Sequence, residues 1–127
     1  GSLKSISGAE GAGIRRFVQI SAIGVDEPVT ADAGDVWRAY VEAKRDADVA
    51  LRESRLDWTI IRPGGLTDDA ASGSVRLAEK VDRAQIPRAD VAAVIAAVLD
   101  DPATIGHQWE VVSGGDPIPD AIAAAVG

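Results

Sequence analysis

Hydrophobic residues along this chain occur either in short continuous runs or at helical spacing. Three runs rich in β-branched and aromatic residues predict buried strands: IRRFVQIS (14–21), LDWTIIRPGG (56–65) and HQWEVVSGG (107–115). SVRLAE (74–79) predicts a further short strand. The segments between them carry helical spacing. This alternation of strands and helices predicts an α/β domain with a small, mostly parallel sheet.

The helical segments have recognisable ends. One helix is predicted from Val36 to Ser54, with Asp35 as its N-cap. A second is predicted within residues 86–102, and a short closing helix or turn within residues 116–126. The expected apolar faces are Val36, Tyr40, Ala43, Ala47 and Ala50 in the first helix, and Val91, Val94, Ile95, Val98 and Leu99 in the second.

Composition narrows the possible partners and sites. The 127 residues are 46% hydrophobic, enough for one domain over residues 1–127. With 13 basic and 20 acidic residues the net charge is -7, which argues against nucleic acid or an anionic membrane surface as partner. There is no cysteine and a single histidine, so no metal site is predicted. Because GSLKSIS has no apolar stretch typical of a signal peptide, we expect a cytoplasmic protein.

Two loops could be taken for ligand sites. SGAEGAG contains Gly8, Gly11 and Gly13, but these glycines come before a predicted strand, whereas a phosphate-binding loop follows one and begins a helix. A helix end and turn leading into the strand is therefore favoured. The acidic loop with Asp26, Glu27, Asp32 and Asp35 lacks the spacing of a calcium loop and is expected to be solvated.

Tyr40 and Lys44 are four residues apart in the first predicted helix, so they should lie on the same face. A tyrosine can act as a general acid when a nearby ammonium group stabilises the phenolate that it leaves behind. The spacing is common in helices, and the alternative is a core tyrosine beside a solvated lysine.

The neighbouring strands make the catalytic interpretation more specific. Ser21 ends the strand before this helix, and Pro63, Gly64 and Gly65 end the strand after it. If these strands are parallel, their carboxyl ends meet at one edge of the sheet, where α/β proteins bind ligands.

The segments that carry a family resemblance are, in order, AGIRRFVQISAIG, YVEAKRDADVALRES, LDWTIIRPGGLTDD, IPRADVAAVIAAVLDDP and WEVVSG. Through them the chain resembles the short-chain dehydrogenase/reductase superfamily, most closely its atypical NAD(P)H-binding, NmrA-like branch. The resemblance implies the catalytic half of a Rossmann-like domain that reduces a small-molecule substrate. It assigns catalysis to Ser21, Tyr40 and Lys44. It assigns contacts with NAD or NADP to Lys44, Pro63 and Gly64, with Gly65, Leu66 and Thr67 as neighbours. Relatives often carry two serines where this chain has Ser21 followed by alanine.

The resemblance covers only the second half of the family's domain, so the chain looks truncated and lacks the glycine-rich half that holds the cofactor's pyrophosphate. Two functions stay open. One is an NAD(P)H-dependent oxidoreductase that needs the other half. The other is a non-catalytic domain that self-associates or binds a partner. In either case the strand Arg16 to Ile20 lacks its family neighbour, and we expect a homo-oligomer, such as a dimer, or a complementary chain to pair with it.

Overall fold

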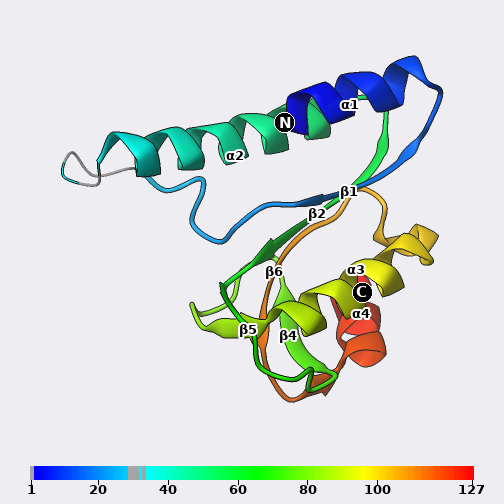
Figure 1. The fold of residues 1–127 in the computed structure, drawn as a ribbon. Helices are drawn as coiled ribbons and strands as arrows, with labels where there is room; N and C mark the ends of the chain where they lie inside the picture. Colours follow the sequence, from blue (N-terminus) through cyan, green and yellow to red (C-terminus); the bar gives the residue numbers. More distant parts are fainter. Residues whose placement is uncertain (1, 29–31, 33) are drawn as a thin grey trace.

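The computed structural model describes residues 2–28, 32 and 34–127. Within these residues a five-stranded sheet has the order β1-β2-β6-β4-β7, and β3 and β5 pair separately. Helices α1 and α2 lie along one face of the sheet, and α3 and α4 lie along the other (Figure 1). The strands are β1 (Arg16–Ile20), β2 (Asp57–Pro63), β3 (Gly65–Thr67), β4 (Ser74–Ala78), β5 (Gln85–Pro87), β6 (Gln108–Ser113) and β7 (Asp116–Pro117). The helices are α1 (Ser2–Gly11), α2 (Asp35–Glu53), α3 (Arg88–Leu99), the 3-10 turn η1 (Pro102–Thr104) and α4 (Ile118–Val126).

The three long hydrophobic runs form the parallel centre of the sheet. β1 pairs with β2, and β2 pairs with β6, both in parallel, whereas β4 and β7 run antiparallel. The predicted α/β fold with a mostly parallel sheet is confirmed. The parallel pairing of β1 and β2 continues past the strand, because the N–H of Ser21 donates to the carbonyl of Ile61 at 2.8 Å. Ser21 and Pro63 therefore leave the sheet at the same edge.

Two apolar clusters hold the helices to the sheet, since strands covered on both faces bury side chains on both. The larger cluster lies under α3 and α4, and the smaller one lies under α1 and α2. The larger contains Ile61, Val75, Leu77, Ile86, Val91, Val94, Val98, Trp109, Val111, Ile118, Ala121 and Ile122. The smaller contains Ile6, Ala9, Leu51, Leu56 and Ile60.

The helix α2 differs from its prediction in two respects. It begins one residue earlier, at Asp35, after a Gly34 with φ of 88°, so Asp35 is not the N-cap and no side chain caps this end. The predicted apolar stripe is wrong at its first three positions, because Val36 is 87% exposed, Tyr40 is 44% exposed and Ala43 is also exposed. The first turns of α2 extend past the strands (Figure 1), so only later turns of the helix are covered. Its buried residues are Val41, Ala47, Asp48 and Leu51.

The short strands β3, β5 and β7 were not predicted, and β5 and β7 overlap the starts of segments where helices were expected. The remaining elements follow the sequence closely. The helix end and turn predicted before β1 are confirmed, with α1 ending at Gly11 and Gly13 in a left-handed conformation at φ 78°. In α3 the predicted face is buried except at Leu99, which is exposed, and at Ile95, which is half-buried. No helix in the described part of the chain is long and apolar enough to cross a membrane.

Candidate functional site

A cleft of about 380 Å³ opens at the carboxyl ends of β1 and β2, and we call it the carboxyl-end cleft. Six of the predicted site residues lie on its wall: Ser21, Tyr40, Pro63, Gly64, Gly65 and Leu66. Parallel strands bring Ser21 and the Pro63–Gly64 pair to one edge, and α2 carries Tyr40 to the same place. Such a crevice outside the carboxyl ends of strands is where open α/β sheets bind ligands.

Tyr40 and Lys44 lie on one face of α2, as their spacing predicts. The Lys44 ammonium is 5.9 Å from the centre of the Tyr40 ring and donates a hydrogen bond to the Ile20 carbonyl at 3.2 Å. The ring of Trp37 stacks on that of Tyr40, with 5.4 Å between the two ring centres. Tyr40 is therefore a cleft residue rather than a core residue. Lys44 is not among the residues that line the cleft.

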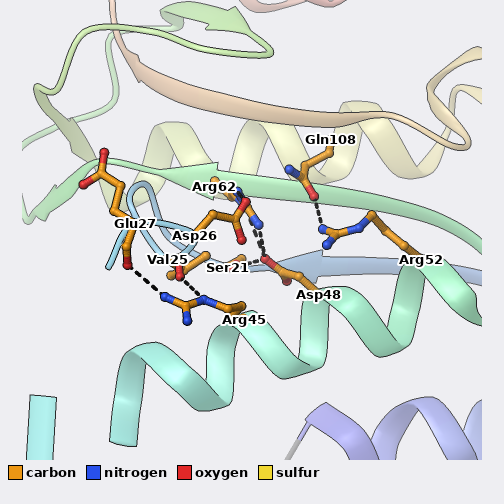
Figure 2. Close-up of polar contacts among 9 residues, drawn as sticks. All are labelled: Ser21, Val25, Asp26, Glu27, Arg45, Asp48, Arg52, Arg62 and Gln108. Carbon is orange, nitrogen blue, oxygen red and sulfur yellow. Dashed lines mark hydrogen bonds and ion pairs between the residues drawn. The ribbon is translucent and has the colours of Figure 1, made fainter. Parts of the chain in front are cut away.

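Ser21 is buried, and its hydroxyl group is already engaged. Its Oγ donates to Oδ2 of Asp48 at 2.6 Å (Figure 2). The serine lines the cleft while its proton points toward α2. The oxygen of Ser21 is consequently available to the cleft as an acceptor.

Asp48 belongs to a buried charge cluster that the sequence analysis missed. The Nε and Nη2 atoms of Arg62 donate to Oδ2 of Asp48 at 3.1 and 2.9 Å, and its Nη1 donates to Asp26 at 2.7 Å (Figure 2). Oδ1 of Asp48 is buried and has no hydrogen-bond partner among the described residues. A signal existed in the sequence, because Arg62 interrupts the apolar run of β2 and a buried guanidinium needs a carboxylate.

The charges of this cluster stabilise one another. Burial alone would lower the pKa of Arg62, but its hydrogen bonds and ion pairs with Asp26 and Asp48 raise the pKa above the ordinary value. The hydrogen bond from Arg62 is the main cause that lowers the pKa of Asp26. Both groups stay ionised near neutral pH and join the loop after β1 to β2 and α2.

A second contact holds the same loop. Arg45 of α2 donates from Nε to the Val25 carbonyl at 2.7 Å and from Nη2 to the Glu27 carbonyl at 2.8 Å (Figure 2). Asp26 and Glu27 are exposed, as expected for a solvated acidic loop, and each also forms an ion pair, with Arg62 and Arg83 respectively. Among the described residues, no group of three or more metal-ligating side chains could hold a metal ion.

The Pro-Gly segment shapes the floor of the cleft. The N–H of Gly64 donates to the Val111 carbonyl at 3.0 Å, and a Cβ at Gly64 would overlap the carbonyl oxygen of Ala84. Glycine is therefore required where the end of β2 meets the segment before β5. Thr67 lies outside the cleft lining, and its buried Oγ1 has no hydrogen-bond partner in the described part of the chain.

Comparisons with known proteins agree with this fold and cleft. Residues 2–102 match the profile of a family described as NAD(P)H-binding. The chain is 36% identical over 122 residues to an uncharacterized sugar epimerase of Bacillus subtilis, a match that covers 96% of this chain and 56% of that protein. The chain spans about half the length of the curated relatives it matches.

Solved structures show the same correspondence. The oxidoreductase ylbE from Lactococcus lactis superposes with a TM-score of 0.86 at 31% identity, over 97% of this chain and 57% of that one. A short-chain dehydrogenase/reductase from Veillonella parvula, solved in complex with NADP, superposes with a TM-score of 0.71 at 26% identity, over 88% of this chain and 57% of that one.

Proposed function

The chain belongs to this NAD(P)H-binding family, and from that premise we propose that it forms the catalytic side of an NAD(P)H-dependent oxidoreductase. The proposed type is the short-chain dehydrogenase/reductase, in line with the oxidoreductase- and epimerase-like relatives. The observation that carries the proposal is that Ser21, Tyr40 and Gly64 line one cleft, with Lys44 beside the Tyr40 ring. These residues come from three separate segments and meet only through the fold.

Each side chain has a distinct role in this proposal. A reduced nicotinamide, when bound, supplies a hydride to the substrate carbonyl carbon. Tyr40 donates a proton to the carbonyl oxygen, and the Lys44 ammonium stabilises the phenolate that remains. Ser21 orients the substrate oxygen, and it does so as an acceptor for the alcohol form because its own proton is bonded to Asp48.

The chain has features that fit the nicotinamide end of the cofactor. Pro63, Gly64 and Leu66 offer an uncharged stretch of the cleft wall to the nicotinamide ring. In this proposal Lys44, whose ammonium lies beside the Tyr40 ring and outside the cleft lining, binds the ribose hydroxyls. The glycines of this chain do not fit the phosphates of the cofactor. Gly8, Gly11 and Gly13 belong to α1 and the turn before β1, whereas a phosphate-binding loop follows a strand. We propose that the longer relatives hold the phosphates with segments outside this chain, and the choice between NAD and NADP rests there.

Two measurements test this function. Isothermal titration of NADPH into the 127-residue chain should show weak or no binding. A dissociation constant in the low micromolar range would contradict the proposal that segments outside this chain hold the phosphates. A chain extended with the preceding segment of the Bacillus subtilis relative should oxidise NADPH in the presence of carbonyl compounds. In that extended chain, Tyr40→Phe should abolish turnover and leave NADPH affinity nearly unchanged, because the hydroxyl acts in the transition state. Lys44→Ala should lower both the turnover and the affinity for NADPH.

The edge strand supports a second function, association with another chain. Among the residues that the structure describes, β1 pairs only with β2, and Ile20 at its end is 46% exposed. An open, apolar strand edge is a template for another strand. Pairing with a second copy, or with a chain that carries the other half of the domain, would cover it, and the same surface would serve a non-catalytic binding domain.

A further inference from the structure

We propose that Arg83 and Arg88 form an anion-recognition site in the carboxyl-end cleft, which selects substrates that carry a carboxylate or phosphate group near the reacting oxygen. The inference rests on the oxidoreductase proposal for the identity of the cleft. It adds an anionic group to the description of the substrate, which the family description does not give.

The charge of the lining is the first observation. Among the described residues that line the cleft, the charged side chains are Arg83 and Arg88, and none is acidic. This is unexpected in a chain with 20 acidic and 13 basic residues. Cationic side chains are therefore concentrated on the wall of this cleft, where a small anion can reach them. Their present partners, Glu27 and Asp68, are not part of the lining.

The space made for Arg83 is the second observation. Gly24 has φ of 86°, and a Cβ on it would overlap the guanidinium group of Arg83. Arg83 also pairs with Glu27 at 2.6 Å, so the guanidinium lies against the loop after β1. Both the left-handed backbone and the absent side chain of Gly24 allow Arg83 to occupy the wall of the cleft.

The weakness of the existing ion pairs is the third observation. Arg88 begins α3 and pairs at 3.1 Å with Asp68, whose side chain is 91% exposed. Glu27, the partner of Arg83, is also mostly exposed. Ion pairs in water contribute little to stability, so an incoming carboxylate or phosphate can replace these partners. Guanidinium groups bind such planar or tetrahedral anions through paired hydrogen bonds.

Direct titration of the 127-residue chain tests the site. Succinate and inorganic phosphate, added at constant ionic strength against chloride, should give saturable shifts of the Arg83 and Arg88 Nε–H signals in NMR spectra and a change in the emission of Trp37, which lines the same cleft. Arg83→Gln and Arg88→Gln should each weaken binding about tenfold, as expected for the loss of a charge-assisted hydrogen bond. Arg76→Gln, an exposed change on β4 outside the cleft, is the matched control and should have no effect.

Two further variants should act in the opposite direction. Glu27→Gln and Asp68→Asn remove the competing carboxylates, so each should tighten anion binding. Linear, unsaturable shifts, or equal affinities in the Arg83→Gln, Arg88→Gln and Arg76→Gln proteins, would overturn the proposal.

The cofactor is an alternative source of phosphate. Competition in the chain extended with the preceding segment of the Bacillus subtilis relative, which should bind NADPH, distinguishes the two sources. If NADPH displaces succinate from the two arginines, they bind cofactor phosphate and the substrate assignment is wrong. If succinate stays bound in the presence of NADPH, the substrate assignment holds. Because neither turnover nor cofactor enters the first titration, its failure would leave the oxidoreductase proposal intact, and a failed turnover assay would leave the anion site intact.

Discussion

The hydroxyl of Ser21 donates to Oδ2 of Asp48 at 2.6 Å, although the two residues are 27 positions apart. The same carboxylate oxygen accepts two hydrogen bonds from Arg62. The residue at the end of β1 is thereby fixed to α2 and to β2 at once. The position of the Ser21 oxygen in the cleft thus depends on a carboxylate that does not line it.

Loss of Asp48 should be the most destabilising change near the cleft. Asp48→Ala leaves Arg62 buried with only Asp26 as its partner, so we expect the free energy of unfolding to fall by about 3–5 kcal/mol. Asp26→Ala should cost about 1 kcal/mol, because Asp26 is half-exposed and water can replace it. Urea denaturation of both variants checks this, and equal losses would contradict the ranking.

Asp90 should make folding sensitive to acid. Burial alone would raise its pKa, but hydrogen bonds from the N–H groups of Gly73 and Ser72 and from the Ser72 hydroxyl outweigh burial and lower the pKa below the ordinary 3.8. A lowered folded pKa contributes stability that is present above 3.8 and is lost as pH falls through the folded value.

Urea denaturation across this pH range checks the role of Asp90. In Asp90→Asn the loss of stability below about pH 4 should be smaller than in the wild type, since a titrating group is gone. The control is Asp82→Asn, at an exposed position, which should keep the wild-type pH dependence. Identical acid profiles for Asp90→Asn and the wild type would refute the assignment.

Neighbouring glycines at the end of β2 should respond differently to alanine. A Cβ at Gly64 would overlap the Ala84 carbonyl, whereas at Gly65 the nearest atom is the Gln85 Cγ at 3.5 Å, an ordinary contact. Gly64→Ala should therefore destabilise the fold by about 1–3 kcal/mol, and Gly65→Ala should be nearly neutral. Thermal denaturation of the two variants would show the difference, and matching midpoints would mean that the Ala84 segment can move away.

The 127-residue chain should self-associate through β1. Its exposed edge and the exposed Ile20 favour pairing with another strand, and Ile20→Lys should shift the population toward monomer by placing a charge at that edge. Light scattering coupled to size exclusion measures both proteins. A sharp wild-type monomer at micromolar concentration, with slowly exchanging amides in Phe17–Ile20, would show that the edge is protected within the chain.

The central strands and the long helix α2 could be predicted from the sequence, whereas the order of strands in the sheet and the short strands β3, β5 and β7 could not. Continuous apolar runs define β1, β2 and β6, because strands covered on both faces need apolar residues on both. Local spacing placed Tyr40 and Lys44 on one helical face. The order of Ser21, this pair and Pro63–Gly64 indicated a site at one sheet edge, since parallel strands end on the same side.

Which residues of each helix are covered could be seen only in the folded protein. Periodicity assigned Val36 and Tyr40 to an apolar stripe, but spacing alone cannot show where a helix extends past its sheet. Leu99 is exposed for a related reason. It is the last residue of α3, and the buried face of this helix ends at the preceding residue, Val98.

The partners of the charged residues could be predicted from the sequence least well. Nothing local distinguishes Asp48 from the solvated acids around it, and only the packing of α2 against β2 places it beside Arg62. Arg83 and Arg88 likewise share a cleft with Ser21 because distant segments converge at the ends of the strands. Hydrophobic pattern is a property of neighbouring residues and can be read along the chain. The partner of a charge is set by contacts between distant segments, and these exist only in the folded protein.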